Sequence, residues 1–320
     1  MKLRPISTLS INRLGLPFVQ LALLFWSVST LAQKPRHHYL QITSDNDSYT
    51  LTGRDGYYTN GLKLLYGWNS NKDSANNTIH SIEIGQLMYN AKNGSYRHLF
   101  ELDRPVTAFL YASYKEAHFN TRKDLLSWAV TLGTIGPPAL GRELQKTIHS
   151  LFNMYQPEEW NYQLKTEIGL NADFRYSPSI QLSKNPYSRL KLLPVFKASL
   201  GNTFTGASLG PVLTLGHMNS NDQTIFWNSH LNGDQKESFF YVHPELVLGI
   251  YDATVQGGLF RKDKGPYTSK LNHIRYRQSV GWMSSGDLFS LGLALVYEQR
   301  VAKTQIRNQW YGKIKLGFSF

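Results

Sequence analysis

The sequence contains no cysteine, so neither disulfide bonds nor a zinc site with thiolate ligands can hold the chain together. It also lacks a Gly-x-Ser-x-Gly motif, which leaves a serine nucleophile of the α/β-hydrolase kind without a candidate. Acidic residues are few, 22 against 34 lysines and arginines. The fold therefore depends on other interactions, and the excess of positive charge indicates an anionic partner.

Apolar stretches long enough to cross a membrane as a helix are missing as well. Residues 14–26 are apolar but are interrupted by glycine, proline and glutamine, and the stretch is too short for a transmembrane helix. It lies between a basic region and a small-residue cleavage site at residues 30–32, as in a secretory signal. We therefore expect residues 1–32 to be a signal peptide and residues 33–320 to form one mature domain.

The mature chain stays basic. It contains 31 of the 34 basic residues and all 22 acidic residues, so its net charge is +9. Nucleic acid is a usual partner of such a charge, but an exported protein rarely meets it. We expect no nucleic acid, and we expect phosphorylated lipid headgroups to be the anionic partner.

The mature sequence alternates between apolar and polar residues with a period of two. In residues 160–176 the even positions are mostly apolar and the odd ones mostly polar, and residues 310–320 repeat the pattern. Such alternation is typical of β-strands with two unlike faces. A soluble sandwich would show it too, but strands of about ten residues or more, aromatic residues near strand ends and a negative mean hydropathy favour a transmembrane β-barrel.

The carboxyl-terminal residue, Phe320, closes the alternating stretch WYGKIKLGFSF. This ending resembles the signal by which Gram-negative outer-membrane barrels are recognised for insertion. We therefore expect a multi-pass protein of the cell outer membrane, with outer-membrane lipids around it and the barrel assembly machinery as a partner.

The alternating blocks predict twelve strands, an even number as in single-chain bacterial barrels. With both chain ends in the periplasm, three long connections lie on the outer rim: residues 46–60, 90–103 and 135–159. The third begins with GPPALGRELQKTIHSLF, in which two prolines precede a helical pattern. The predicted fold is all-β, a 12-stranded antiparallel transmembrane β-barrel with a short helix in the third outer loop. Its strands are expected near residues 37–49, 57–69, 78–90, 104–117, 122–134, 160–182, 188–202, 205–219, 237–255, 268–284, 286–300 and 308–320.

Five short motifs lie in or beside these three loops. They are Asn46-Asp47, Tyr58-Thr59-Asn60-Gly61, Asp103-Arg104, Gly133-Thr134-Ile135-Gly136-Pro137, and Gln145 to His149. In this order they resemble the motifs of the lipid A 3′-O-deacylase family of Gram-negative outer membranes, and the resemblance covers nearly the whole mature chain. It implies a hydrolase that removes an ester-linked acyl or acyloxyacyl chain from the lipid A of lipopolysaccharide.

The residues themselves indicate how such a hydrolysis would proceed. Gln145 and His149 are four residues apart and therefore lie on one face of a helix. Imidazole is the side chain that titrates nearest to neutral pH, so His149 could take a proton from a water molecule that attacks an ester carbonyl. The developing oxyanion needs positive charge, and oxygen ligands suit calcium better than zinc. The candidate oxygen ligands are Asn46, Asp47, Thr59 and Gln145.

The family resemblance implies the same chemistry, with His149 as the base, calcium at the oxyanion and no acyl-enzyme. A lysine of the second outer loop also contributes in the family, and Lys92 is its nearest match. Where one family member has a glutamate six residues after the histidine, this chain has Tyr155, so Glu158 or Glu159 would have to replace it. The residues with implied active-site roles are Asn46, Asp47, Thr59, Gln145 and His149, of which Asp47, Thr59 and Gln145 are the expected calcium ligands.

Other functions fit the same sequence. Asn-Asp at a strand end is commonly a turn, and a helix in an outer loop is commonly a plug, so the chain could be a non-enzymatic barrel that serves as a pore or binds lipopolysaccharide. A phospholipase barrel would also use calcium, but it needs a serine and a histidine close together. An enzyme requires His149, whereas a scaffold should tolerate its replacement by alanine.

Overall fold

The computed structural model describes residues 36–50, 56–69, 77–180, 189–232 and 236–320. The expected signal peptide, residues 1–32, lies outside the described residues. Within those residues, none of the helices has both the length and the apolar character that a membrane span requires.

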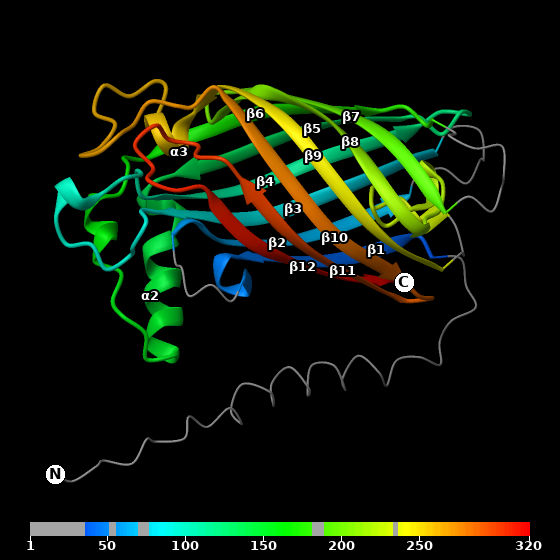
Figure 1. Ribbon diagram of the computed structural model, residues 1–320, viewed down its shortest axis with the longest axis horizontal. Coiled ribbons are helices and arrows are strands. Elements are labelled where there is room, and N and C mark those ends of the chain that lie inside the picture. Colours follow the sequence, from blue (N-terminus) through cyan, green and yellow to red (C-terminus); the bar gives the residue numbers. More distant parts are fainter. Residues whose placement is uncertain (1–35, 51–55, 70–76, 181–188, 233–235) are drawn as a thin grey trace, which may run out of the picture. The chain divides into compact units, whose positions relative to one another are not determined.

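Twelve antiparallel strands close into a barrel, in which each strand pairs with its neighbours in sequence and β1 pairs with β12 (Figure 1). The predicted fold, a twelve-stranded antiparallel barrel with a short helix in the third outer loop, is confirmed. The strands are β1 (His38–Asn46), β2 (Tyr57–Asn69), β3 (Asn77–Asn90), β4 (Thr107–Phe119), β5 (Leu125–Ile135), β6 (Glu167–Ser177), β7 (Leu190–Gly201), β8 (Phe204–His217), β9 (Glu237–Asp252), β10 (Ile274–Ser285), β11 (Phe289–Glu298) and β12 (Gln309–Ser319).

The period of two in the sequence places apolar side chains on the outside of the barrel and polar ones inside. Leu132, Ile168, Leu200 and Leu246 are among the many large apolar residues that are exposed on strands. Because successive side chains of a strand point to opposite faces, the alternate positions line the interior. This arrangement, apolar outside and polar inside, is that of a barrel surrounded by lipid.

Several strands are shorter than the sequence predicted, and the sixth and the first show why. The sixth was expected over residues 160–182 but forms only over Glu167–Ser177, because Glu158–Tyr162 form a 3-10 helix, η5, in the third outer loop. Trp160, which continues the alternation, is fully buried in that loop. The first strand ends at Asn46, where a 3-10 turn, η2 (Asp47–Thr50), begins.

The loop between β8 and β9 blocks one end of the barrel interior. Its residues Met218, Ile225 and Trp227 are buried in one apolar cluster with inward-facing strand residues such as Tyr39 and Leu193. The loop is held by hydrogen bonds from the Lys191 ammonium group to its carbonyl oxygens. Since Tyr39 near the start of β1 pairs with Ser319 at the end of β12, this blocked end is the one where β1 begins and β12 ends.

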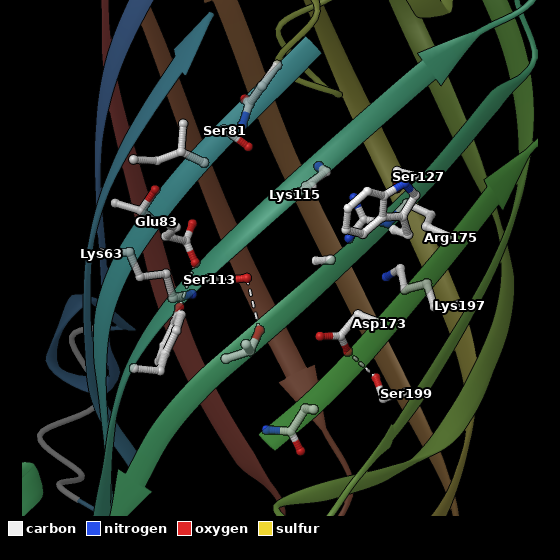
Figure 2. Close-up of a pocket in the computed structure, with 18 of the residues that line it drawn as sticks. Lys63, Ser81, Glu83, Ser113, Lys115, Ser127, Asp173, Arg175, Lys197 and Ser199 are labelled. Carbon is white, nitrogen blue, oxygen red and sulfur yellow. Dashed lines mark hydrogen bonds between the residues drawn. The ribbon is translucent and has the colours of Figure 1, made fainter. Parts of the chain in front are cut away.

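Above this loop the interior contains a cavity of about 470 Å³ (Figure 2). Its charged lining is mostly cationic, with only Glu83 and Asp173 as carboxylates. Among the described residues, the ammonium groups of Lys63 and Lys313 share the Asp45 carboxylate and that of Lys197 pairs with Glu245. The lining cations are Lys63, Lys115, Arg175, Lys197, Lys313 and Lys315.

Replacing Lys115 with methionine is expected to stabilise the barrel. Its ammonium group forms no ion pair or hydrogen bond with any described residue, and it lies on β4 between Ser81 and Ala129 of the neighbouring strands. The cavity holds six cations and two carboxylates, so removing one cation relieves repulsion between like charges, worth about 1 kcal/mol at a separation of about 4 Å in water. The measurement is the temperature at which the detergent-solubilised barrel loses its folded mobility on a gel.

The matched control is Lys197→Met, which removes the partner of the buried Glu245 carboxylate, 2.7 Å away. This variant should unfold at a lower temperature than the wild type, because a buried carboxylate loses its ion pair. Destabilisation of similar size in both variants would contradict the distinction between a paired and an unpaired interior cation.

Candidate active site

The three outer loops named from the sequence meet at one end of the barrel, opposite the β8–β9 loop. In Figure 1 the helix of the third loop, α2 (Gly141–Leu151), stands at this end and runs across the barrel axis. The five motifs therefore come together on one rim, as the succession of strands predicted.

The first outer loop is tied at its beginning by Asn46 and Asp47. The Asn46 side-chain oxygen accepts a hydrogen bond from the amide of Ser48 at 2.8 Å, which is the turn-forming role that asparagine often has. The Asp47 carboxylate is buried and accepts from the amide of Gly56 at 2.7 Å. Asp47 thus holds the two ends of the loop together and stands at the rim as a buried anionic group.

Thr59 occupies a β-bulge between β2 and β3. The register shifts between Tyr58, opposite Tyr89, and Asn60, opposite Met88, so Thr59 is an extra residue in β2. A bulge re-aims the side chain of the extra residue. The buried Thr59 hydroxyl donates to the side-chain oxygen of Asn90 at 2.8 Å.

The helix α2 approaches the barrel wall through two glycines. Gly136 has a φ of +82°, and a Cβ atom there would meet the Leu164 carbonyl oxygen at 2.9 Å, so only glycine fits this turn. A Cβ atom on Gly141 would lie 2.5 Å from both Ala108 and the Trp160 ring. The absent side chains let the first turn of the helix pack directly on β4.

The buried face of α2 carries the predicted pair. Gly141, Gln145 and His149 are the buried residues of the helix, each four positions after the last. Gln145 and His149 are each only 4% exposed. The prediction that both point to the same side of one helix is confirmed by this burial.

The Gln145 amide has a fixed orientation. Its Oε1 accepts from the Trp160 indole N–H at 2.6 Å and from the Asn90 amide at 3.0 Å. An indole N–H can only donate, so Oε1 must face Trp160. Nε2 is buried and forms no hydrogen bond with the described residues. Gln145 therefore offers a donor to the site, and its predicted role as an oxygen ligand of calcium does not fit, because Oε1 already accepts two hydrogen bonds.

The His149 imidazole has a fixed tautomer. Its Nδ1 lies 2.7 Å from the backbone oxygen of Tyr155, and a carbonyl oxygen accepts only, so Nδ1 carries the proton. The Tyr155 ring packs edge-on against the imidazole with 4.7 Å between centroids. In the neutral ring Nε2 is then the unprotonated nitrogen, and it forms no hydrogen bond within the described part of the chain. A neutral imidazole held in this way is an orientated base.

Glu159 is the acidic residue that reaches the site from the third loop. It is fully buried, and its two oxygens accept from the Asn90 amide at 2.5 Å and from the backbone amide of Ala91 at 3.0 Å. Glu158 is only partly buried, and its side chain accepts from Asn161 near the surface. Of the two residues proposed to replace the glutamate missing at Tyr155, the geometry therefore selects Glu159.

The second outer loop is fastened by Asp103. Its carboxylate accepts from the Tyr57 hydroxyl at 2.5 Å and from the backbone amides of Lys92 and Ile306. The backbone of Lys92 is thereby placed beside the first loop, while its side chain is partly buried and forms no hydrogen bond or ion pair with a described residue. The catalytic contribution expected of Lys92 remains a prediction.

Arg104, the other half of the Asp-Arg motif, is structural. It is fully buried over the ring of Tyr89, 4.5 Å from its centroid, and donates to the Thr254 hydroxyl at 3.0 Å. Burial lowers the pKa of its guanidinium group, and nearby carboxylates, first Asp252, oppose the shift. It joins the second outer loop to the loop after β9.

The donor set at the rim suits a calcium ion in part. Asp47 and Glu159 are buried carboxylates and Thr59 is a buried hydroxyl, all hard oxygen donors of the kind that calcium prefers. Thr59 and Glu159 both bond to the same Asn90 amide, which brings them to one place. The described residues contain no group of three or more His, Cys, Asp or Glu side chains that could hold a metal, so hydroxyl, carbonyl or water oxygens would have to complete such a site.

Asn90 and Trp160 were not singled out from the sequence. Asn90 is the last residue of β3 and joins Thr59, Gln145 and Glu159 through one amide. Trp160 looked like one more apolar residue of an alternating strand. Trp160 directly follows Glu158 and Glu159 in the sequence. Its contact with Gln145, however, depends on how the third outer loop folds back.

Comparisons with known proteins agree with this fold. The family model described as "Outer membrane protein LpxR" matches residues 18–320. Among solved structures, "LpxR from Salmonella typhimurium" is similar over 88% of this chain and 100% of its own, with 21% sequence identity and a TM-score of 0.74. At this identity the structural likeness concerns the fold.

Two autotransporter barrels are similar at a lower level. The β domain of the Bordetella autotransporter Brka has 8% identity and a TM-score of 0.47, covering 90% of this chain and 99% of its own. The translocator domain of NalP from Neisseria meningitidis has 9% identity and a TM-score of 0.44, covering 95% and 96%. No curated protein matches the chain in sequence.

Proposed function

The chain belongs to the LpxR family of outer-membrane proteins, and from this premise we propose that it is a calcium-dependent lipid A 3′-O-deacylase. Its substrate is lipopolysaccharide, from which it hydrolyses an ester-linked acyl or acyloxyacyl chain. The observation that carries the proposal is the His149 imidazole, which is buried at the outer rim with Nδ1 held by the Tyr155 carbonyl. A base at the outer rim would face the leaflet that contains lipopolysaccharide, which supports the proposal.

In the proposed reaction, Nε2 of His149 takes a proton from water as the water oxygen attacks the ester carbonyl carbon. The tetrahedral intermediate then breaks the bond to the sugar oxygen, which receives the proton back from His149. The products are a fatty acid and a free 3′-hydroxyl. No serine hydroxyl bonds to His149 among the described residues, which supports direct attack by water over an acyl-enzyme of the phospholipase kind.

Charge develops on the carbonyl oxygen during this attack, and Gln145 is suited to meet it. Its buried Nε2 is an unused donor directed by the indole of Trp160, as an oxyanion stabiliser requires. Bound calcium would supply positive charge to the same oxygen, with Asp47, Thr59 and Glu159 as the residues that would hold it. Lys92 and Asn46 are proposed to assist at the rim.

The blocked interior argues against the alternative of an open pore. The β8–β9 loop fills the end of the barrel near the termini with Met218, Ile225 and Trp227. Ions would have to cross this apolar cluster. A barrel that only binds lipopolysaccharide remains the competing function, and it requires neither a tautomer-locked histidine nor an orientated amide.

Two further proposals concern export. Residues 1–32 have the composition of a signal peptide, and we infer that it is removed. The last strand pairs with β1 and ends in an exposed Phe320, which supports recognition of this strand by the barrel assembly machinery.

The test is mass spectrometry of lipid A from a Gram-negative host with and without the protein. Expression of the wild type should produce lipid A that lacks the mass of the 3′-linked acyl or acyloxyacyl group, and the released fatty acid should appear in the medium or membrane. Lipid A of unchanged mass, although the barrel is folded and inserted and calcium is present, would contradict the proposal and favour the scaffold.

A further inference from the structure

We propose that the far end of α2 inserts into the acyl-chain region of the outer leaflet and anchors the active-site helix on the membrane. The surface in question is formed by Leu151, Phe152 and Met154, called here the helix tip. These side chains are 74%, 59% and 46% exposed. Large apolar side chains that are exposed close together outside a strand mark contact with a partner or a membrane.

The position of the helix indicates lipid as that partner. The first turn of α2 is fixed to the barrel wall, because Gly141 packs against Ala108 of β4 and the Trp160 ring. A helix of eleven residues extends about 16 Å from there. In Figure 1 it runs across the barrel axis, and its far end projects beyond the outline of the wall. The helix tip therefore stands over the surroundings of the barrel rather than over its mouth.

Along the barrel axis, the outer ends of the strands that carry the site lie at the same height as a girdle of aromatic residues. Tyr297 and Trp310 pack together with ring centroids 4.8 Å apart, and Tyr276 lies beside them on the outside of the barrel. Exposed aromatic groups of this kind form the girdle of a barrel at the headgroup level. Asn46 is paired with Gly312, two residues from Trp310, so the strand end that carries the site lies at the girdle.

The contacts of α2 place the helix at the same height along the barrel axis as this girdle. Gln145 bonds to Asn90, and Asn90 is opposite Tyr57 at the outer end of β2. The helix therefore lies near the plane where headgroups meet acyl chains. Arg142 and Lys146, one turn apart and partly buried on α2, supply positive charge next to phosphorylated headgroups. Cationic side chains combined with an apolar surface are the features of an interfacial helix, whose apolar side enters the boundary by about 5–10 Å.

Insertion of the helix tip would also bring the acyl chains beside the proposed base. His149 is two residues before Leu151, on the opposite, buried side of the same turn. A lipid whose acyl chains contact the tip would then lie beside the turn that carries His149, without leaving the leaflet. The inference rests on the outer-membrane family and on this geometry, and it holds independently of whether His149 hydrolyses an ester.

The test uses the absence of cysteine from the chain, because a single Phe152→Cys substitution gives one thiol for an environment-sensitive fluorophore. The full mature chain is reconstituted in vesicles that contain lipopolysaccharide, with nitroxide quenchers attached to phospholipid acyl chains or with iodide in the water. We expect the acyl-chain nitroxide to quench the probe at position 152 several-fold more than iodide does. The matched control is Glu143→Cys, on the exposed face of the first turn of α2, for which iodide should be the stronger quencher.

Strong quenching by iodide at position 152 would overturn the proposal and show a tip exposed to water. Protection from both quenchers would overturn it as well, since it would indicate a protein partner or a second copy of the chain. A Leu151→Cys probe repeats the measurement if the first variant inserts poorly. Because the readout is fluorescence, its failure is distinguishable from a failure to deacylate lipid A.

Discussion

Replacing His149 with glutamine is expected to lower the rate of lipid A deacylation by about two to four orders of magnitude, the usual contribution of a general base. Glutamine keeps a polar side chain of similar reach and can still donate to the Tyr155 carbonyl, as Nδ1 does at 2.7 Å. Its amide cannot take a proton from water. The measurement is the initial rate on lipopolysaccharide with purified protein in detergent.

The barrel should be unaffected by this change, because His149 belongs to an outer loop and to no strand. Unchanged heat-modifiable mobility on a gel therefore separates loss of the base from loss of the fold. The matched control is His98→Gln, at an exposed histidine of the second outer loop, which should retain the wild-type rate. If His149→Gln folds, inserts and deacylates at near the wild-type rate, α2 is a plug and another residue is the base.

The barrel could be predicted from the sequence because a membrane imposes one pattern on every strand. Lipid outside and a polar interior require the period of two, and only a closed sheet satisfies all backbone groups in a bilayer. The succession of strands, with both chain ends in the periplasm, then predicted which loops share a rim. His149 and Gln145 could be paired because the spacing of four residues is a property of the helix itself.

The remaining parts of the site depend on contacts that no local pattern encodes. Asn90 and Glu159 are 69 residues apart and meet through one hydrogen bond. The alternation of residues 160–164 continues that of β6, so a strand was predicted where η5 forms. The orientation of the Gln145 amide is set by the Trp160 indole, which only the fold brings within 2.6 Å.

The β8–β9 loop was missed for a related reason. Six polar residues separate Met218 from Ile225, Phe226 and Trp227, and these positions give no period that would distinguish a loop folded into the barrel from an exposed one. Their burial arises because the interior of the barrel at this end is lined by apolar residues, such as Tyr39 and Leu193, that need to be covered. The sequence alone therefore could not show that the β8–β9 loop folds into the barrel, because the apolar lining that it covers is formed only in the folded barrel.

Removing divalent ions is expected to lower the rate of deacylation by about a hundredfold or more, since an uncompensated oxyanion adds several kcal/mol to the barrier. Calcium added back should restore the rate, and zinc should do so poorly, because the donors at the site are oxygen atoms. The measurement is the initial rate in chelator and along a calcium titration. Full activity in chelator would contradict this proposal and leave Gln145 and Lys92 as the groups that stabilise the oxyanion.

The same titration can assign the acidic ligand. Glu159→Gln keeps the shape of the side chain but removes the charge beside Asn90 and Ala91, so the calcium concentration for half-maximal rate should rise by about 10–100-fold. Saturating calcium should restore most of the rate, which a loss of folding would not allow. Glu158→Gln, the same change one residue earlier at a partly exposed position, should leave the titration unchanged. If the two variants behave alike, the buried carboxylate only supports the loop, and neither Glu158 nor Glu159 replaces the glutamate at whose position this chain has Tyr155.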